Sequence, residues 1–127
     1  MLSWFKRFRT AAYKPLILID IGYPSHQLSQ ALLETGQYKI VAYIDEEPWS
    51  HLTQMNGANI HYPSELLALA EKNRVVAVIK FEGAGWQPDD RCLSLLANLK
   101  VNYITLASDE TLAQQVERVI KLTAIDR

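Results

Sequence analysis

Runs of aliphatic and aromatic residues recur along this chain and alternate with segments in which apolar residues repeat every three to four positions. The uninterrupted runs are typical of parallel strands that are covered on both faces. The intervening segments are typical of helices that bury one face. The strands predicted in this way span residues 16–21, 39–45, 59–62, 75–81 and 101–106.

Helix start and stop signals mark the segments between these strands. Ser25 is expected to cap the first helix, and Gly36 is expected to end it. Pro63 opens the second helix, Asp89 starts the third, and residues 108–110 open the last. Because strands and helices alternate roughly every 25–30 residues, the crossovers should be right-handed and the sheet mostly parallel. The sequence therefore predicts an α/β fold, a single domain of three layers.

The composition limits the classes of protein to which the chain can belong. With 127 residues, of which 49% are hydrophobic and 21% charged, it can form one globular domain with a single core. Its net charge of −1 argues against nucleic-acid binding, which needs a concentrated positive field. Cys92 is the one cysteine, and its place on the inward face of the third helix predicts an inert core thiol. No apolar run reaches the ~18 residues of a membrane span, so we expect a cytoplasmic protein.

The first residues, MLSWFKRFRTAAYK, differ in composition from the rest of the chain. The basic residues here are Lys6, Arg7, Arg9 and Lys14, and the interleaved aromatic residues include Trp4, Phe5 and Phe8. A helix with this composition suits contact with an anionic surface, such as the inner membrane, or docking on a partner. The alternative, which we favour, is that the aromatic side chains pack on the domain or on a second copy of the chain. We therefore divide the chain into a basic aromatic leader, residues 1–14, and a domain, residues 15–127.

The sequence LILIDIGYPSHQL, residues 16–28, has the strand, turn and helix with which nucleotide-binding α/β domains begin. A dinucleotide site needs glycine at the turn, so that backbone amides can approach the pyrophosphate, and an acidic residue about 20 positions later to hold the ribose. Gly22 meets the first requirement, and Asp45, at the end of the second strand, meets the second. In open parallel sheets the ligand edge is formed by the carboxyl ends of the strands. That edge should bring together residues 20–25, 45–49, 80–86 and 107–109.

This arrangement resembles the Rossmann-like N-terminal domain of bacterial nucleotide-sugar and polysaccharide proteins. That family includes CapD-type dehydratases and epimerases, PglD-type sugar acyltransferases, and sugar-transferase relatives with a CoA-binding-like domain. Its pattern is a strand, G-x-G-x-x-G, a helix, a strand that closes in acidic residues and proline, and then G-V-P-V. Residues 41–48, VAYIDEEP, match the acidic close, and residues 57–60, GANI, match the second signature. The resemblance covers about residues 16–106 and implies NAD, CoA or a nucleotide-sugar as the ligand.

The chain departs from this family at the glycine motif, where it has DIGYPS. Gly22 is the one glycine kept; Ser25 is a small substitute for the last, and Asp20 replaces the first. At ~4 Å two like charges repel by about 1 kcal/mol in water, and by several times more when partly buried. Asp20 therefore opposes a pyrophosphate, while Tyr23 and Pro24 fill space and Pro24 removes an amide donor. We expect the phosphate contacts of the family to be altered or lost.

Other residue types capable of chemistry have simpler explanations. Lys80 and Glu82 are expected at the ligand edge. Two interpretations are open there: contact with a polar ligand, or an ion pair with each other on the surface. Residues 83–86, GAGW, are expected to form a flexible loop with an exposed aromatic, Trp86, which suits a lid or a partner contact, and Trp49 suits the same two roles. Two further pairs of residues favour structural over catalytic or metal-binding roles. Ser25 and His26 are neighbours at a helix start without an orienting acid, which argues against a nucleophile and base. His51 and His61 have no cysteine or histidine at metal-ligand spacing, so we expect surface histidines and no metal.

Two functions remain open. The first is a non-catalytic Rossmann-like module that binds a nucleotide-type ligand weakly and regulates or assists envelope-polysaccharide or nucleotide-sugar metabolism. The second is a fold without a ligand that serves as an interaction module for a partner protein or a second copy. An autonomous enzyme is not expected, because the catalytic residues of the family lie in further domains. The predicted ligand-binding residues are Asp20, Gly22, Tyr23, Ser25, Asp45 and Lys80.

Overall fold

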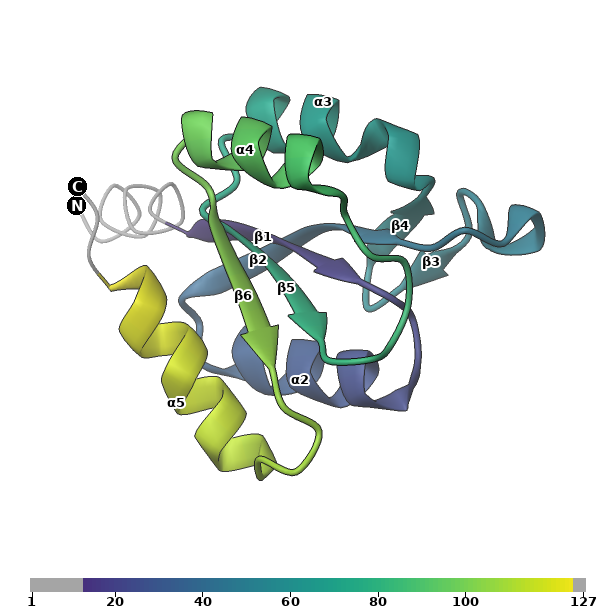
Figure 1. Cartoon of the computed structure of the whole chain (residues 1–127). Helices are drawn as coiled ribbons and strands as arrows, with labels where there is room; N and C mark the ends of the chain where they lie inside the picture. The colour runs from purple at the N-terminus through teal and green to yellow at the C-terminus, as the bar shows by residue number, and fades with distance from the viewer. Residues whose placement is uncertain (1–12, 125–127) are drawn as a thin grey trace, which may run out of the picture.

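Six strands form one sheet in the order β3-β4-β2-β1-β5-β6 (Figure 1). The structure is a computed structural model and describes residues 13–124. Five strands are parallel, and β3 (Gln54–Met55) pairs antiparallel with β4 at one edge. The parallel strands are β1 (Lys14–Ile19), β2 (Tyr38–Ile44), β4 (Ala58–His61), β5 (Ala77–Phe81) and β6 (Asn102–Leu106). The prediction of a mostly parallel sheet is confirmed.

Helices cover both faces of this sheet (Figure 1). The helices α2 (Tyr23–Glu34) and α5 (Leu112–Thr123) lie on one face, and α3 (Leu66–Lys72) and α4 (Asp90–Asn98) lie on the other. Two short 3-10 helices, η1 (Pro48–Ser50) and η2 (Pro63–Glu65), lie in the connections before β3 and α3. This arrangement is the predicted three-layer Rossmann-like domain.

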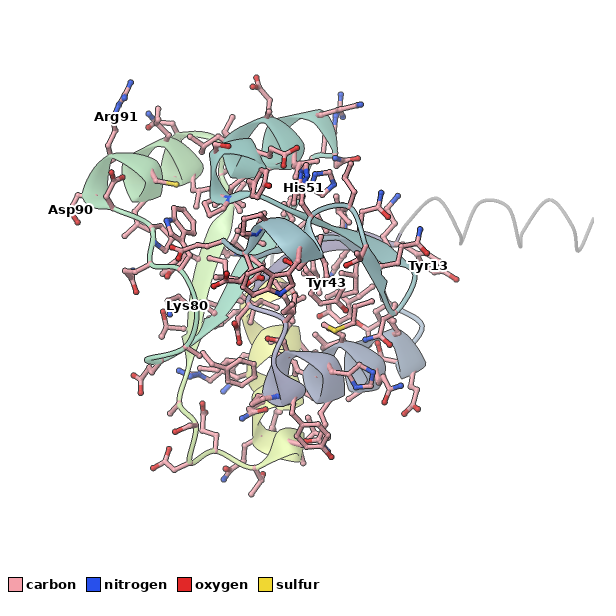
Figure 2. The ribbon with its side chains drawn as sticks, turned by 90° about the vertical axis from the view of Figure 1, so that its right-hand side faces the viewer. Tyr13, Tyr43, His51, Lys80, Asp90 and Arg91 are labelled. Atoms are coloured by element: carbon pink, nitrogen blue, oxygen red, sulfur yellow. The ribbon has the colours of Figure 1, made fainter. Side chains whose placement is uncertain are left out.

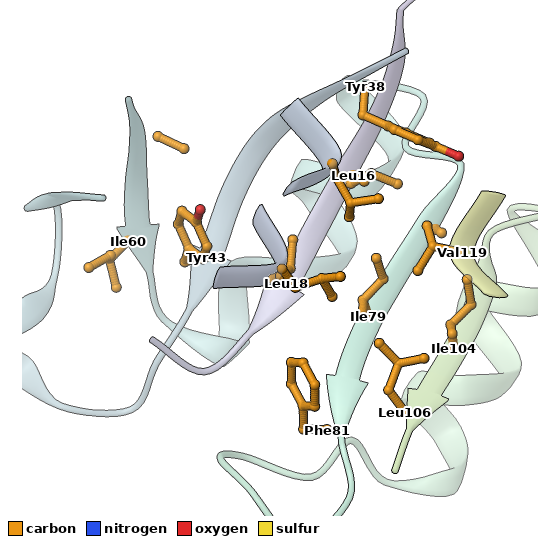
Figure 3. Packing of buried hydrophobic residues seen from close by; sticks show 14 residues of the cluster. Leu16, Leu18, Tyr38, Tyr43, Ile60, Ile79, Phe81, Ile104, Leu106 and Val119 are labelled. Carbon is orange, nitrogen blue, oxygen red and sulfur yellow. The ribbon is translucent and has the colours of Figure 1, made fainter. Parts of the chain in front are cut away.

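The central strand β1 contributes to two cores because its side chains alternate between the faces of the sheet. Leu16 and Leu18 pack into the cluster under α2 and α5, which Figure 3 shows. Ile17 and Ile19 pack into the cluster under α3 and α4. All four side chains are fully buried. Each such burial stabilises the fold by about 1.5–3 kcal/mol, which explains why the strand before the turn is an unbroken aliphatic run.

Hydrogen bonds fasten the amino-terminal edge of the sheet to the end of α5. The hydroxyls of Tyr38 and Thr123 lie 2.6 Å apart in a buried contact, and Lys14 Nζ donates to the Thr123 carbonyl at 2.8 Å. Lys14, the last residue of the predicted leader, is the first residue of β1. Residues 1–12 of that leader lie outside the described residues.

The structure corrects two predicted helix starts. The first helix begins at Tyr23 with Gly22 as its N-cap, so Ser25 lies inside the helix and caps nothing. Pro24 explains the earlier start, because its fixed φ favours the first turn of a helix. The last helix is capped by Thr111, whose hydroxyl accepts from the Gln114 amide at 3.1 Å, and does not begin at residues 108–110.

The sequence did not predict the hairpin β3–β4. Asn56 and Gly57 connect the two strands with φ values of 50° and 82°. Asn-Gly with positive φ at both positions is typical of the type I′ turn of a two-residue hairpin. We call residues 45–53, between β2 and β3, the excursion. The hairpin returns the chain from it to the sheet at β4.

Candidate functional site

The strand order reverses between β1 and β5, because the chain runs from β1 outward through β2 and β4 and then returns to the other side of β1. In open parallel sheets the ligand site lies at such a switch point, at the carboxyl ends of the strands. Backbone contacts bring the predicted loops together there. The Asp20 amide donates to the Ile44 carbonyl at 2.7 Å, and the Glu82 amide donates to the Leu106 carbonyl at 2.9 Å.

Asp20 occupies the turn after β1 in a conformation that favours glycine. Its φ is 89°, in the region that L-residues rarely adopt, although aspartate tolerates positive φ better than most. This is the position at which the resembled family has its first glycine. The Asp20 carboxylate folds toward α2, and its Oδ2 accepts from the Gly22 amide at 3.2 Å. A carboxylate of the chain itself therefore lies at the helix start where a phosphate would bind.

The start of α2 offers few amides to a phosphate. The first four N–H groups of a helix have no partner within the helix, and these are what an anion binds. In α2 they belong to Gly22, Tyr23, Pro24 and Ser25. The Gly22 amide already donates to the Asp20 carboxylate, and Pro24 has no backbone N–H. Two donors remain, the amides of Tyr23 and Ser25.

The side chains of Tyr23 and Ser25 lie on different sides of α2. Tyr23 is 69% exposed, and its hydroxyl accepts from Gln27 Nε2 at 2.8 Å. Ser25 belongs to the buried stripe of the helix together with Leu28 and Leu32, so its small side chain serves the close packing of helix on sheet. Its Oγ is buried without a hydrogen-bond partner among residues 13–124.

Asp45 follows β2 at the same edge, and its carboxylate is partly engaged within its own loop. Its Oδ2 accepts from Ser50 Oγ at 2.8 Å and from the Glu47 amide at 3.4 Å. Its own amide donates to the His61 carbonyl at 3.0 Å. Both bonds that residues 13–124 make to this carboxylate reach Oδ2. Oδ1 therefore remains for a hydroxyl such as those of a ribose.

Lys80, labelled in Figure 2, lies within β5 and is buried, with 3% of its surface exposed. Its Nζ donates to the carbonyls of Phe81 and Ala84 at 3.1 and 2.5 Å. The ammonium group thus holds the loop after β5 in place. Lys80 therefore contributes to the ligand edge by positioning this loop.

Gly85 is a residue of this site that the sequence pattern did not predict. Its φ is 78°, and a Cβ added to it would lie 2.8 Å from the Asp20 Cβ. The loop after β5 therefore packs directly on the turn after β1. The signal in the sequence was the pair of glycines at 83 and 85, which indicated only a flexible loop. Trp86, expected as an exposed aromatic, is partly buried against the core under α3 and α4.

His51 and His61 meet Glu65 at the outer part of the same edge. The His51 Nε2 and His61 Nδ1 atoms lie 2.9 and 3.0 Å from the two Glu65 carboxylate oxygens. Hydrogen bonds from the Tyr62 amide and the two histidines lower the pKa of Glu65 to about 2, with the Tyr62 bond the largest cause. Cysteine and histidine spacing alone did not predict this cluster, because it depends on a glutamate and on the hairpin that brings His51 back to His61.

Cys92 lies half-buried in the first turn of α4. Burial, with a smaller effect of the nearby Asp89 carboxylate, raises the pKa of its thiol. A protonated thiol is a poor nucleophile.

Within the described part of the chain, no helix combines the length and apolarity that crossing a membrane requires.

A cavity of about 580 Å³ lies at the opposite end of the sheet, lined by residues that include Lys14, Arg74 and Lys100. None of the six predicted ligand-binding residues lines it. We therefore place the candidate site at the open edge beside Asp20 and Asp45, where the strand order and the turn chemistry agree, and not in this cavity.

Comparison with known proteins identifies the fold. No protein-family model matches the chain, and no curated protein matches its sequence at a significant level. Among solved structures, it is similar to UDP-D-quinovosamine 4-dehydrogenase from Vibrio fischeri, with a TM-score of 0.62 and 24% identity over 88% of this chain and 90% of that one. It is also similar to RSP, a Rex-family repressor, with a TM-score of 0.58 and 11% identity over 97% of this chain and 65% of that one. At such identities the similarity shows a Rossmann-like fold.

Proposed function

We propose that this chain is a non-catalytic Rossmann-like module that binds a nucleotide-type ligand at the edge formed by Asp20, Gly22 and Asp45, with altered phosphate contacts. The observation that carries the proposal is the Asp20 carboxylate at the start of α2, 3.2 Å from the Gly22 amide. It fills the anion position of the fold with a group of the chain, while Asp45 keeps its place after β2.

The similar structures support a ligand of this class. One is a dehydrogenase named for a UDP-sugar, and RSP has also been solved in complex with beta-NADH, at a TM-score of 0.57 to this chain. The resemblance to CapD-type and PglD-type proteins extends the proposal to a regulatory or accessory role in polysaccharide or nucleotide-sugar metabolism. NAD, CoA and nucleotide-sugars are the ligands to test first.

Thermal unfolding with NAD, NADP, CoA, a UDP-sugar and ATP tests the proposal. A ligand present at 100 times its dissociation constant stabilises the fold by about 2.7 kcal/mol. Asp20→Asn keeps the size and an acceptor oxygen but removes the charge. Since the repulsion is at least about 1 kcal/mol, we expect it to raise affinity for a phosphate-bearing ligand about fivefold or more.

Asp45→Asn and Glu46→Gln complete the design. Asp45→Asn should weaken binding of the same ligand, whereas Glu46→Gln removes a neighbouring exposed carboxylate and should leave affinity unchanged. The nucleotide proposal is overturned if neither the natural protein nor Asp20→Asn is stabilised by any of these ligands.

A second function, an interaction module, has one observation in its favour. Trp49 and Leu52, in the excursion between β2 and β3, are 77% and 55% exposed. Exposed large apolar side chains close in sequence are typical of contact surfaces. If this surface joins two copies, sedimentation should show association that Trp49→Ser abolishes, and a monomer at all concentrations would exclude it.

A further inference from the structure

We propose that His51, His61 and Glu65 form a binding site for a divalent transition-metal ion of the zinc type. The three residues come from three segments: the connection after η1, the end of β4, and η2. One ligand atom from each residue can be chosen so that all three lie within 4.8 Å of one another. Figure 2 labels His51, which lies near the start of α3.

The present spacing is close to what a metal requires. Zinc binds histidine nitrogen and carboxylate oxygen at about 2.0–2.2 Å, so neighbouring ligand atoms in a tetrahedral site lie about 3.3 Å apart. The His51 Nε2 and His61 Nδ1 atoms lie 2.9 and 3.0 Å from the Glu65 oxygens. A metal between them needs an opening of a few tenths of an ångström at each of these two contacts, and the three ligand atoms already lie within 4.8 Å of one another.

The ligand side chains are already oriented by their surroundings. The Tyr62 amide donates to Glu65 Oε1 at 2.8 Å, which fixes the carboxylate. The His51 ring stacks on the Tyr62 ring with centroids 3.9 Å apart and planes at 8°. Partners that hold ligands in place are what metal sites in proteins commonly require. Little rearrangement is therefore needed to bind an ion.

The donor set also selects the kind of ion. Two imidazoles and one carboxylate suit zinc and its neighbours in the transition series, whereas calcium and magnesium prefer oxygen ligands alone. The side chains of His51, His61 and Glu65 are 26%, 17% and 36% exposed, so an ion can enter from solvent. Three protein ligands leave a fourth position for water or for a donor atom of a bound molecule.

The site adjoins the proposed nucleotide edge but does not depend on it. The Asp45 amide donates to the carbonyl of His61, one of the metal ligands. The metal ligands themselves are separate from the residues assigned to the nucleotide. Failure of metal binding would therefore leave the nucleotide proposal intact, and the reverse also holds.

Titration of untagged, chelator-treated protein with Co²⁺ and Zn²⁺ tests the proposal. We expect one Co²⁺ per chain, with the intense visible absorption of a four- or five-coordinate ion, and displacement of that ion by Zn²⁺. His51→Ala and His61→Ala should each weaken binding by at least about 100-fold, since loss of a residue that only orients a ligand already costs about 10–100-fold. His26→Ala is the matched control, because His26 lies on α2 outside the cluster.

Glu65→Gln separates a metal site from a hydrogen-bonded cluster. The amide keeps one acceptor for the Tyr62 amide but is a poor metal ligand, so Co²⁺ affinity should fall while the far-ultraviolet circular dichroism stays unchanged. The proposal is overturned if the natural protein shows no Co²⁺ spectrum, or if His51→Ala and His61→Ala bind Co²⁺ as tightly as His26→Ala. In that case the three side chains only fasten the excursion after β2 to the start of α3.

Discussion

Asp20 combines a backbone conformation that favours glycine with a charged side chain. The turn after β1 requires positive φ, and Asp20 adopts 89° there without being glycine. Its carboxylate stabilises this strained backbone conformation by accepting a hydrogen bond from the Gly22 amide. The same bond places a negative charge where the fold otherwise binds phosphate. The carboxylate therefore supplies both the local hydrogen bond and the charge, and Asp20→Asn separates the two, because asparagine keeps an acceptor oxygen and tolerates positive φ.

Ser25 and Ser29 offer a test of an unsatisfied buried hydroxyl within one helix. Both are buried on α2, but Ser29 Oγ donates to the Ser25 carbonyl at 2.7 Å, whereas Ser25 Oγ has no partner in the part of the chain that the structure describes. Burying an unpartnered hydroxyl costs about 1–3 kcal/mol. Ser25→Ala should therefore raise the free energy of unfolding by about 1 kcal/mol, measured with urea, and Ser29→Ala should leave it unchanged or lower it. Equal destabilisation by both substitutions would contradict this explanation.

At the scale of elements, the hydrophobic pattern was sufficient to identify the five parallel strands and the four helices that cover them. The N-cap of α4 was also predictable, and the Asp89 carboxylate accepts from the Cys92 amide at 2.8 Å. The start of α5 was not, because residues 108–110 carry an equally good signal. What decides it is the Thr111 and Gln114 pair, together with Glu110, whose carboxylate is bound by the Ala107 amide and Arg118.

The packing of the loop after β5 on the turn after β1 can be measured with a pair of glycines. Gly85 and Gly83 have similar φ values of 78° and 75°, but only at Gly85 does an added Cβ clash, at 2.8 Å from the Asp20 Cβ. Alanine at either position should cost about 1–2 kcal/mol for its backbone conformation. At Gly85 overpacking should add about 1–3 kcal/mol.

Asp20→Gly provides the control, because it removes the Cβ that alanine at 85 would meet. In Asp20→Gly protein, Gly85→Ala should therefore cost no more than Gly83→Ala, with unfolding free energies measured by urea denaturation. If the excess cost at Gly85 survives in that background, the two loops are not in the contact described.

At the scale of the whole molecule, the sequence predicted which loops share the carboxyl edge of the sheet but not which side chains meet there. Order along the chain and strand alternation were enough to place Asp20, Asp45 and the loop after Lys80 at one edge. The contact of Gly85 with Asp20 and the cluster of His51, His61 and Glu65 depend on side-chain packing between distant segments. Such packing follows from tertiary structure, and spacing along the chain does not encode it.

The free energy of unfolding should fall at acid pH because of the Glu65 cluster, when it is measured with a chelator present to exclude metal ions. The folded pKa of Glu65, about 2, is below its ordinary value of 4.5, so its contribution is fully present above pH 4.5 and is lost as the pH falls toward 2. Because the side chain is 36% exposed, solvent screens these contacts, and we expect about 1 kcal/mol in place of the full shift. Glu65→Gln should therefore reduce the unfolding free energy near pH 6 and converge with the natural protein near pH 2.

Glu71→Gln, on an exposed position of α3, controls for the loss of one negative charge. If the difference between Glu65→Gln and the natural protein is constant from pH 6 to 2, the carboxylate is not held by the Tyr62 amide and the histidines as described.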